Sequence, residues 1–256
     1  MPTMEELKMF HDAAGHRVAG ILATPSQPTD RMVVLCHGFL STKNSSTNKA
    51  LTRLLTEQGI ATFRFDFFGQ GESEGPFSDI TLSIALDQAM SALDVVASSG
   101  YRRIGLMGSS FGGLVVILTA AKRTDLRAVA LKCPVADFAE VLRLELGEAG
   151  MDTWKQRGEI PDVTGGPRPL RLHYALYEDC LGYDAYKAAE SMHAAVLAVQ
   201  GDCDELVPLH QSRRLMDGIR TDKRLEILKE ADHGFTKRED FLRMTELIAS
   251  WMVQHL

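Results

Sequence analysis

A strand, a tight Gly-x-Ser-x-Gly turn and a helix follow one another without a gap, and this combination restricts the fold more than any other feature. The apolar run 103–107 has the length of a buried strand, the turn spans 108–113, and the apolar run 114–121 is long enough with its flanks for a buried helix. A serine in this context can sit on a sharp bend with its hydroxyl exposed to solvent. Ser110, the central residue, is therefore the candidate nucleophile.

The two glycines of this turn have a steric reason to be there. A strand-to-helix turn this tight brings backbones close together, so side chains at positions 108 and 112 would collide with neighbouring elements. Ser109 competes with Ser110 as the nucleophile, but only Ser110 has glycine at both minus two and plus two. An ordinary glycine-rich turn before a helix is the alternative interpretation of the stretch.

Composition narrows the class of protein. The chain has 256 residues, 45% of them hydrophobic and 24% charged, which suits one large α/β domain with a substantial core. A net charge of -6 argues against a nucleic-acid partner. Since no apolar run reaches membrane-spanning length and the polar N-terminus has no apolar signal region, we expect a cytoplasmic protein without a membrane partner. The four cysteines lack metal-ligand spacing, so we expect free thiols and no metal.

Predicted strands and helices alternate along most of the chain. We expect strands at 4–10, 17–23, 32–36, 60–65, 103–107, 128–133, 195–200 and 224–229, with helices at 47–58, 81–97, 114–121, 209–219 and 237–254. Thr236 and Glu239 have capping-box spacing at the start of the last helix. The alternation favours a mostly parallel central sheet of about eight strands with helices on both faces, an α/β fold.

One edge of this sheet is expected to carry the site. Ligands bind outside the carboxyl ends of the strands in such folds, so the loops 37–39, 66–73 and 108–112 should meet there. The alternation stops at about 135–189, where residues 137–146 look helical and 156–160 with 168–174 fit a hairpin around Gly165-Gly166. This insertion leaves from the active edge, so we expect a single domain over 1–256 with a cap at about 135–189. A segment packed only on its own aromatic residues is the alternative.

A catalytic constellation is spaced along the chain. A serine hydroxyl needs a base within hydrogen-bond reach, and the base needs an orienting acid. On such sheets the chain order is nucleophile, acid, histidine. The chain has Ser110, then Asp204 after the strand 195–200, then His233 after the last strand, with Asp202 competing for the acid role. All of them follow strands, so they are predicted to meet at the same edge.

The motifs together resemble a known superfamily. They are His37-Gly38-Phe39 and the runs 66–73, 108–113, 201–208 and 232–235, and they are similar to those of α/β-hydrolase serine hydrolases. Within that superfamily the chain resembles cinnamoyl/feruloyl-type esterases and the serine aminopeptidase-like (S33-type) family. The resemblance implies the α/β-hydrolase fold with a small inserted cap. It covers nearly the full length and is weakest across the cap.

The resemblance also implies the roles of individual residues. Ser110 would be the nucleophile, His233 the general base and acid, and Asp204, four residues before Pro208 as in the family pattern, the orienting carboxylate. Where relatives often have histidine before the nucleophile, this chain has Ser109.

The resemblance places an oxyanion hole at the backbone N–H groups of Phe39 and Phe111. His37 is interpreted as a brace of the oxyanion loop rather than a second base. Asp66 is interpreted as an anchor that holds its glycine loop through hydrogen bonds to backbone N–H groups.

We therefore expect a serine hydrolase that cleaves carboxylic esters with short-chain or aromatic acyl groups through an acyl-enzyme intermediate, with no metal or organic cofactor. The expected partner is a small-molecule ester, and a homodimer is left open. The alternatives are a thioesterase, an aminopeptidase-like serine peptidase and a non-catalytic binding member of the fold, which the intact triad disfavours. A peptidase would need carboxylates to hold an α-ammonium group, and the insertion offers Glu140, Glu145, Glu148, Asp152 and Glu178.

Overall fold

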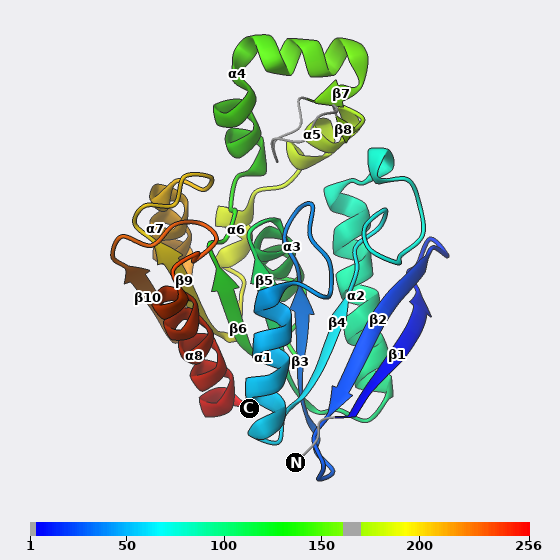
Figure 1. Ribbon diagram of the computed structural model, residues 1–256, viewed down its shortest axis with the longest axis vertical. Helices are drawn as coiled ribbons and strands as arrows, with labels where there is room; N and C mark the ends of the chain where they lie inside the picture. The colour runs from blue at the N-terminus through cyan, green and yellow to red at the C-terminus, as the bar shows by residue number, and fades with distance from the viewer. Residues whose placement is uncertain (1–3, 161–169) are drawn as a thin grey trace.

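The computed structural model describes residues 4–160 and 170–256 (Figure 1). Its main sheet has the strand order β1-β2-β4-β3-β5-β6-β9-β10, and β7 and β8 form a separate pair. The strands are β1 (Met4–His11), β2 (Arg17–Thr24), β3 (Arg31–Cys36), β4 (Ala61–Phe65), β5 (Arg103–Ser109), β6 (Leu126–Lys132), β7 (Glu159–Ile160), β8 (Leu170–Arg171), β9 (Ala195–Gly201) and β10 (Lys223–Leu228). The helices are α1 (Ser46–Glu57), α2 (Leu82–Ser98), α3 (Phe111–Ala120), α4 (Phe138–Arg157), α5 (Ala175–Cys180), α6 (Ala185–Ala189), α7 (Leu209–Gly218) and α8 (Arg238–His255), with a short 3-10 turn at Phe77–Asp79.

The sheet is parallel from β4 to β10, and β1 and β2 extend it as antiparallel strands. Central strands such as β3 are almost entirely apolar because helices cover both faces of the sheet. The parallel strands therefore end at one common edge, at the top of Figure 1. This is the mostly parallel α/β-hydrolase architecture that the alternation and the motifs predicted.

Two groups of helices cover the two faces. Helices α1 and α8 pack against each other and against one face, where Leu51 and Leu55 of α1 meet Met244 and Ile248 of α8 in one apolar cluster. Helices α2, α3 and α7 belong to the cluster on the other face. The fully buried helix α3 follows β5 directly and lies at the centre of the second cluster. Both layers leave the carboxyl edge of the sheet open to the loops.

The segment between β6 and β9 is here called the inserted segment. Its elements α4, β7, β8 and α5 stand above that edge, whereas α6 packs beside α3 (Figure 1). Its long helix α4 is broken at Gly147, whose backbone is far from helical at φ 62 and ψ 174. The first half corresponds to the predicted helix 137–146. The predicted hairpin strands 156–160 and 168–174 are confirmed in part, as the short antiparallel pair β7-β8. Residues 156–157 instead belong to α4, which continues to Arg157. The predicted turn at Gly165-Gly166 lies outside the described residues.

The last helix begins within one residue of the predicted start, but the predicted capping by Thr236 is wrong. Lys237, not Thr236, is the N-cap residue of α8, and no side chain caps that end. The hydroxyl of Thr236 instead donates to the carboxylate of Asp232, which also accepts the Thr236 N–H at 2.8 Å. The local turn after β10 therefore competes successfully for the threonine. No helix in residues 4–160 or 170–256 has both the length and the apolar character needed to cross a membrane.

Candidate active site

Ser110 sits at a strained bend between β5 and α3. Its backbone has φ 52 and ψ -119, which a residue with a side chain rarely adopts. A Cβ at Gly108 would lie 2.3 Å from the carbonyl oxygen of Gly112, and one at Gly112 would lie 2.3 Å from that of His37. The contacts are with backbone atoms, so neither clash could be relieved by a side-chain rotation. The steric reason inferred for both glycines is thus confirmed.

The two serines of the motif differ in their surroundings. Both line one pocket of about 420 Å³ at the carboxyl edge. The hydroxyl oxygen of Ser109 is buried without a partner among the described residues. Among the described residues, the Ser110 hydroxyl also forms no hydrogen bond. His233 lines the same pocket but is not hydrogen-bonded to Ser110. Catalytic hydrogen bonds are often long without substrate, so the shared pocket is the more informative observation.

Asp204 and His233 form a close pair behind this pocket. Nδ1 of His233 lies 2.9 Å and 3.0 Å from the two carboxylate oxygens of Asp204. Since a carboxylate only accepts, Nδ1 carries the hydrogen and Nε2 is left free to accept one. The Asp204 side chain is 1% exposed and also accepts the N–H groups of Leu206 and Val207. Burial opposes its ionisation, but the hydrogen bonds and charge of His233 outweigh burial and hold the pKa of Asp204 below its usual value.

The competing carboxylate points elsewhere. Asp202 is exposed and accepts the backbone N–H of Glu230 at 2.5 Å. Glu205 accepts the backbone N–H of His233 at 3.0 Å rather than its ring. Asp204 is therefore the acid whose carboxylate meets the imidazole of His233.

The loop after β3 is held by a neutral histidine. Nδ1 of His37 donates to the carbonyl of Gly38 at 2.8 Å, and its Nε2 accepts the N–H of Phe67 at 3.0 Å. Burial lowers the pKa of His37 to about 4, so the ring stays uncharged near neutral pH. Both ring nitrogens are thus used to fix backbone. This arrangement agrees with the interpretation of His37 as a brace.

Asp66 anchors its glycine loop, as the sequence indicated. Its carboxylate accepts the backbone N–H of Lys43 at 2.6 Å and that of Glu72 at 2.9 Å, and it pairs with the buried ammonium group of Lys43. A Cβ at Gly71 would overlap this carboxylate, at 2.1 Å from one oxygen. The aspartate therefore ties together the loops that follow β3 and β4.

Phe39 and Phe111, the predicted oxyanion-hole residues, follow β3 and begin α3 respectively. Phe39 lines the pocket, and Phe111 is the first residue of α3, directly after Ser110. Among the described residues, neither backbone N–H has a hydrogen-bond acceptor. Their rings pack together at 5.7 Å between centroids, and each also contacts Phe138 of the inserted segment. Two unoccupied donors thus lie beside Ser110 on a well-packed base.

Three residues that contact the Asp204–His233 pair were not predicted from the sequence. Nζ of Lys132 donates to the His233 carbonyl at 2.7 Å, and Sγ of Cys133 donates to the same oxygen at 3.6 Å. Nε2 of Gln200 donates to Asp204 at 3.2 Å. Their position in the sequence could have indicated that they lie near the site, because all three are at the carboxyl ends of buried strands. Cys133, Asp204 and His233 also bring ligand atoms within 4.8 Å of one another, but the Asp204–His233 hydrogen bond already occupies that cluster.

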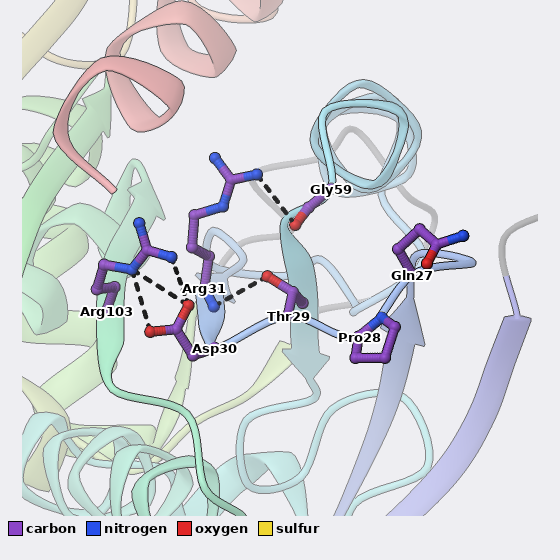
Figure 2. A pocket seen from close by; sticks show the side chains of 7 residues that line it. All are labelled: Gln27, Pro28, Thr29, Asp30, Arg31, Gly59 and Arg103. Atoms are coloured by element: carbon purple, nitrogen blue, oxygen red, sulfur yellow. Dashed lines mark hydrogen bonds and ion pairs between the residues drawn. The ribbon is translucent and has the colours of Figure 1, made fainter.

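A second hollow, of about 480 Å³, lies at the opposite edge of the sheet (Figure 2). It is lined by the starts of β3 and β5, where Arg103 pairs with Asp30 and Arg31 donates to the carbonyls of Gln58 and Gly59. Each of these charged side chains already has a hydrogen-bond partner within the protein. None of the catalytic candidates lines this hollow. The pocket at the carboxyl edge is therefore the candidate active site.

The family model described as "Serine aminopeptidase, S33" matches residues 27–157, just over half of the chain. The chain belongs to this family. It is thus a hydrolase of the α/β-hydrolase superfamily, as the motifs around Ser110 indicated.

Individual relatives extend the match beyond those residues. The palmitoyl-protein thioesterase ABHD10, mitochondrial, of Homo sapiens is 24% identical over 215 residues, covering 81% of this chain and 68% of that protein. An uncharacterized 31.7 kDa protein of Escherichia coli is 23% identical over 262 residues, covering 88% of this chain and 91% of that protein. The solved structure of Est1E from Butyrivibrio proteoclasticus with ferulic acid has a TM-score of 0.84 at 24% identity, covering 97% of this chain and 99% of that one. This structural likeness shows the shared fold.

Proposed function

We propose that this chain is a serine hydrolase that cleaves carboxylic esters with short-chain or aromatic acyl groups through an acyl-enzyme intermediate. The observation that supports this most is the joint placement of Ser110 and His233 in one pocket, with Asp204 2.9 Å behind the imidazole. The accepting Nε2 of His233 is the atom that a serine proton requires.

In the proposed mechanism, Oγ of Ser110 attacks the ester carbonyl carbon while Nε2 of His233 takes its proton. The carbonyl oxygen becomes an oxyanion, which the N–H groups of Phe39 and Phe111 would stabilise by roughly 3 kcal/mol each. When the tetrahedral intermediate collapses, the C–O bond to the alcohol breaks and His233 protonates the leaving oxygen. Water then attacks the acyl-enzyme, again with His233 as base, and releases the acid and free Ser110.

The inserted segment is proposed to act as a cap over this site, within a single domain spanning residues 1–256. Val135, Phe138, Val141 and Glu145 of this segment line the pocket with Ser110. Three of these side chains are apolar, which suits an apolar acyl or alcohol group. The aromatic cluster of Trp154, Tyr174 and Tyr177 instead packs within the segment itself.

Matched serine variants test the proposal. Ser110→Ala is expected to abolish hydrolysis of 4-nitrophenyl acetate, 4-nitrophenyl butyrate and methyl ferulate, and to abolish labelling by a fluorophosphonate probe. Ser109→Ala is the control, because it removes a hydroxyl from the adjacent position and is expected to retain labelling. Labelling that survives Ser110→Ala and disappears in Ser109→Ala would reverse the assignment.

A thioesterase is the second candidate, favoured by the similarity to the palmitoyl-protein thioesterase ABHD10. The chemistry of Ser110 would be the same, so paired oxygen esters and thioesters of one acyl group would separate the two activities. An aminopeptidase is less well supported, because Glu145 is the one member of the predicted carboxylate set that lines the pocket. Glu140 is engaged with His210 and Gln211.

A further inference from the structure

Lys132 brings a positive charge into the pocket. It is the last residue of β6, is 7% exposed, and lines the pocket with Ser110 and His233. Its Nζ donates to the carbonyl of His233 at 2.7 Å and lies 5.2 Å from the centre of the Phe235 ring. Among the described residues no carboxylate pairs with it. Two of its three N–H donors therefore remain for another acceptor.

A buried lysine without a counter-ion is costly, because the charge has lost its water. The chain contains a direct comparison in Lys43, which is 1% exposed but pairs with Asp66 and Glu72. Lys43 thus serves the structure alone. Lys132 has only a carbonyl and an aromatic face, and it faces the space that a substrate would fill.

The N-terminus of helix α1 adds to the positive potential around Lys132. Helix α1 begins at the pocket wall, since Ser45, Ser46 and Thr47 all line the pocket and its first turn contains no acidic residue. The positive end of the α1 dipole therefore faces the same space. Glu145 is the one acidic side chain of the described lining, and it is exposed to solvent.

We propose that Lys132 binds a carboxylate carried by the substrate, so that the preferred esters are anionic. The proposal rests on the proposed function, because it assigns a substrate class to the same pocket. A single ammonium group with two available donors suits one carboxylate, whereas phosphate sites commonly add the bidentate fork of an arginine. The carboxylate would supply the counter-ion that the protein itself does not provide.

Two pairs of substrates test this inference, one for each side of the scissile bond. The 4-nitrophenyl ester of adipic acid is compared with that of adipic monoamide, and 4-carboxyphenyl butyrate with 4-carbamoylphenyl butyrate. Lys132→Met is expected to lower kcat/KM for the carboxylate member of at least one pair by roughly tenfold to a hundredfold more than for its amide partner. Lys132→Arg is expected to keep the preference. Lys122→Met changes the net charge equally at an exposed site after α3 and should leave the preference unaltered.

The outcomes separate this inference from the proposed function. If no member of either pair is cleaved in a Ser110-dependent way, the proposed function fails. If both pairs are cleaved but Lys132→Met affects the two members of each pair equally, the inference is overturned and Lys132 only positions His233. Should Lys132→Met fail to fold, the unmodified protein still decides, because adipate must inhibit at least tenfold more strongly than adipamide.

Discussion

Replacing Asp204 by asparagine tests the proposed triad through the hydrogen bonds of one side chain. Oδ1 of Asp204 accepts the N–H groups of Leu206 at 3.0 Å and Val207 at 2.8 Å, while Oδ2 accepts Nε2 of Gln200 at 3.2 Å. An amide oxygen can keep the two backbone bonds of Oδ1. The amide nitrogen of Asn would then take the place of Oδ2 and direct its hydrogens toward His233 and Gln200.

This exchange favours the other tautomer of the His233 imidazole. Nδ1 of His233 lies 3.0 Å from Oδ2, so an amide N–H at that position favours the tautomer in which Nδ1 accepts. The ring hydrogen is then on Nε2, which could no longer take the proton of Ser110. A serine-protease triad loses about four orders of magnitude in kcat from the equivalent change, which corresponds to a barrier higher by about 5.5 kcal/mol. We expect a loss of this size in Asp204→Asn, with a smaller effect on KM.

The assay is the initial rate on 4-nitrophenyl butyrate, with the thermal midpoint recorded to show that the variant folds. Asp202→Asn is the matched control, because that carboxylate is exposed, accepts the Glu230 N–H and forms no hydrogen bond to the His233 ring among the described residues. It is expected to stay within about threefold of the parent rate, since exposed substitutions seldom change stability by more than about 0.5 kcal/mol. A folded Asp204→Asn protein with more than a tenth of the parent rate would refute the reasoning, and collapse of Asp202→Asn instead would move the acid role to Asp202.

Three further predictions concern stability. Ser110→Gly should unfold with a free energy about 1 kcal/mol higher than Ser110→Ala in urea titrations, because only glycine relieves the strained φ of 52; equal values would contradict the strain. Gly112→Ala places its Cβ 2.3 Å from a backbone oxygen and should destabilise the fold by about 3 kcal/mol or more, whereas Gly182→Ala, with 3.3 Å available, should not. His37 has a folded pKa of about 4 against an ordinary 6.5, so the unfolded chain binds the proton first as pH falls. Stability on the order of 3 kcal/mol should therefore be lost between these pH values, and the slope of unfolding free energy against pH should be shallower in His37→Gln.

The sequence predicted those elements whose hydrophobic pattern and turn residues match the environment in which they pack. The G-x-S-x-G turn, the buried strands and the glycine-ended loops are each fixed by short-range sterics and hydrophobic pattern, so Ser110 and His233 could be placed at one edge without coordinates. The steric reason for Gly108 and Gly112 is of this kind, because the clash is with backbone that any sequence would have.

What could not be predicted depends on contacts between distant segments. The residues alone left Asp202 and Asp204 open as the acid, and the resemblance favoured Asp204 by its spacing to Pro208. Which carboxylate reaches the loop after β10 depends on a contact between distant segments, which the loop's own sequence does not encode. The second half of α4 carries too weak an apolar pattern, since Met151 and Trp154 are its buried side chains and their partners come from residues after 170. Lys132 is an ordinary strand end in the sequence, and it gains its significance from the His233 carbonyl about a hundred positions away.

Backbone strain in this molecule is concentrated around the candidate site. In the described part of the chain, five residues other than glycine have positive φ: Leu40, Ser110, Cys133, Glu230 and Phe235. They lie in the loops that follow β3, β5, β6 and β10, which all end at the carboxyl edge. Each such conformation costs on the order of 1–3 kcal/mol and persists only where surrounding packing enforces it. His233, between two of these residues, is held at its N–H by Glu205, at its carbonyl by Lys132 and at its ring by Asp204. A residue whose backbone is held at two points and whose ring is held at a third needs little reorganisation when a proton moves through the ring, which is the property that a general base requires.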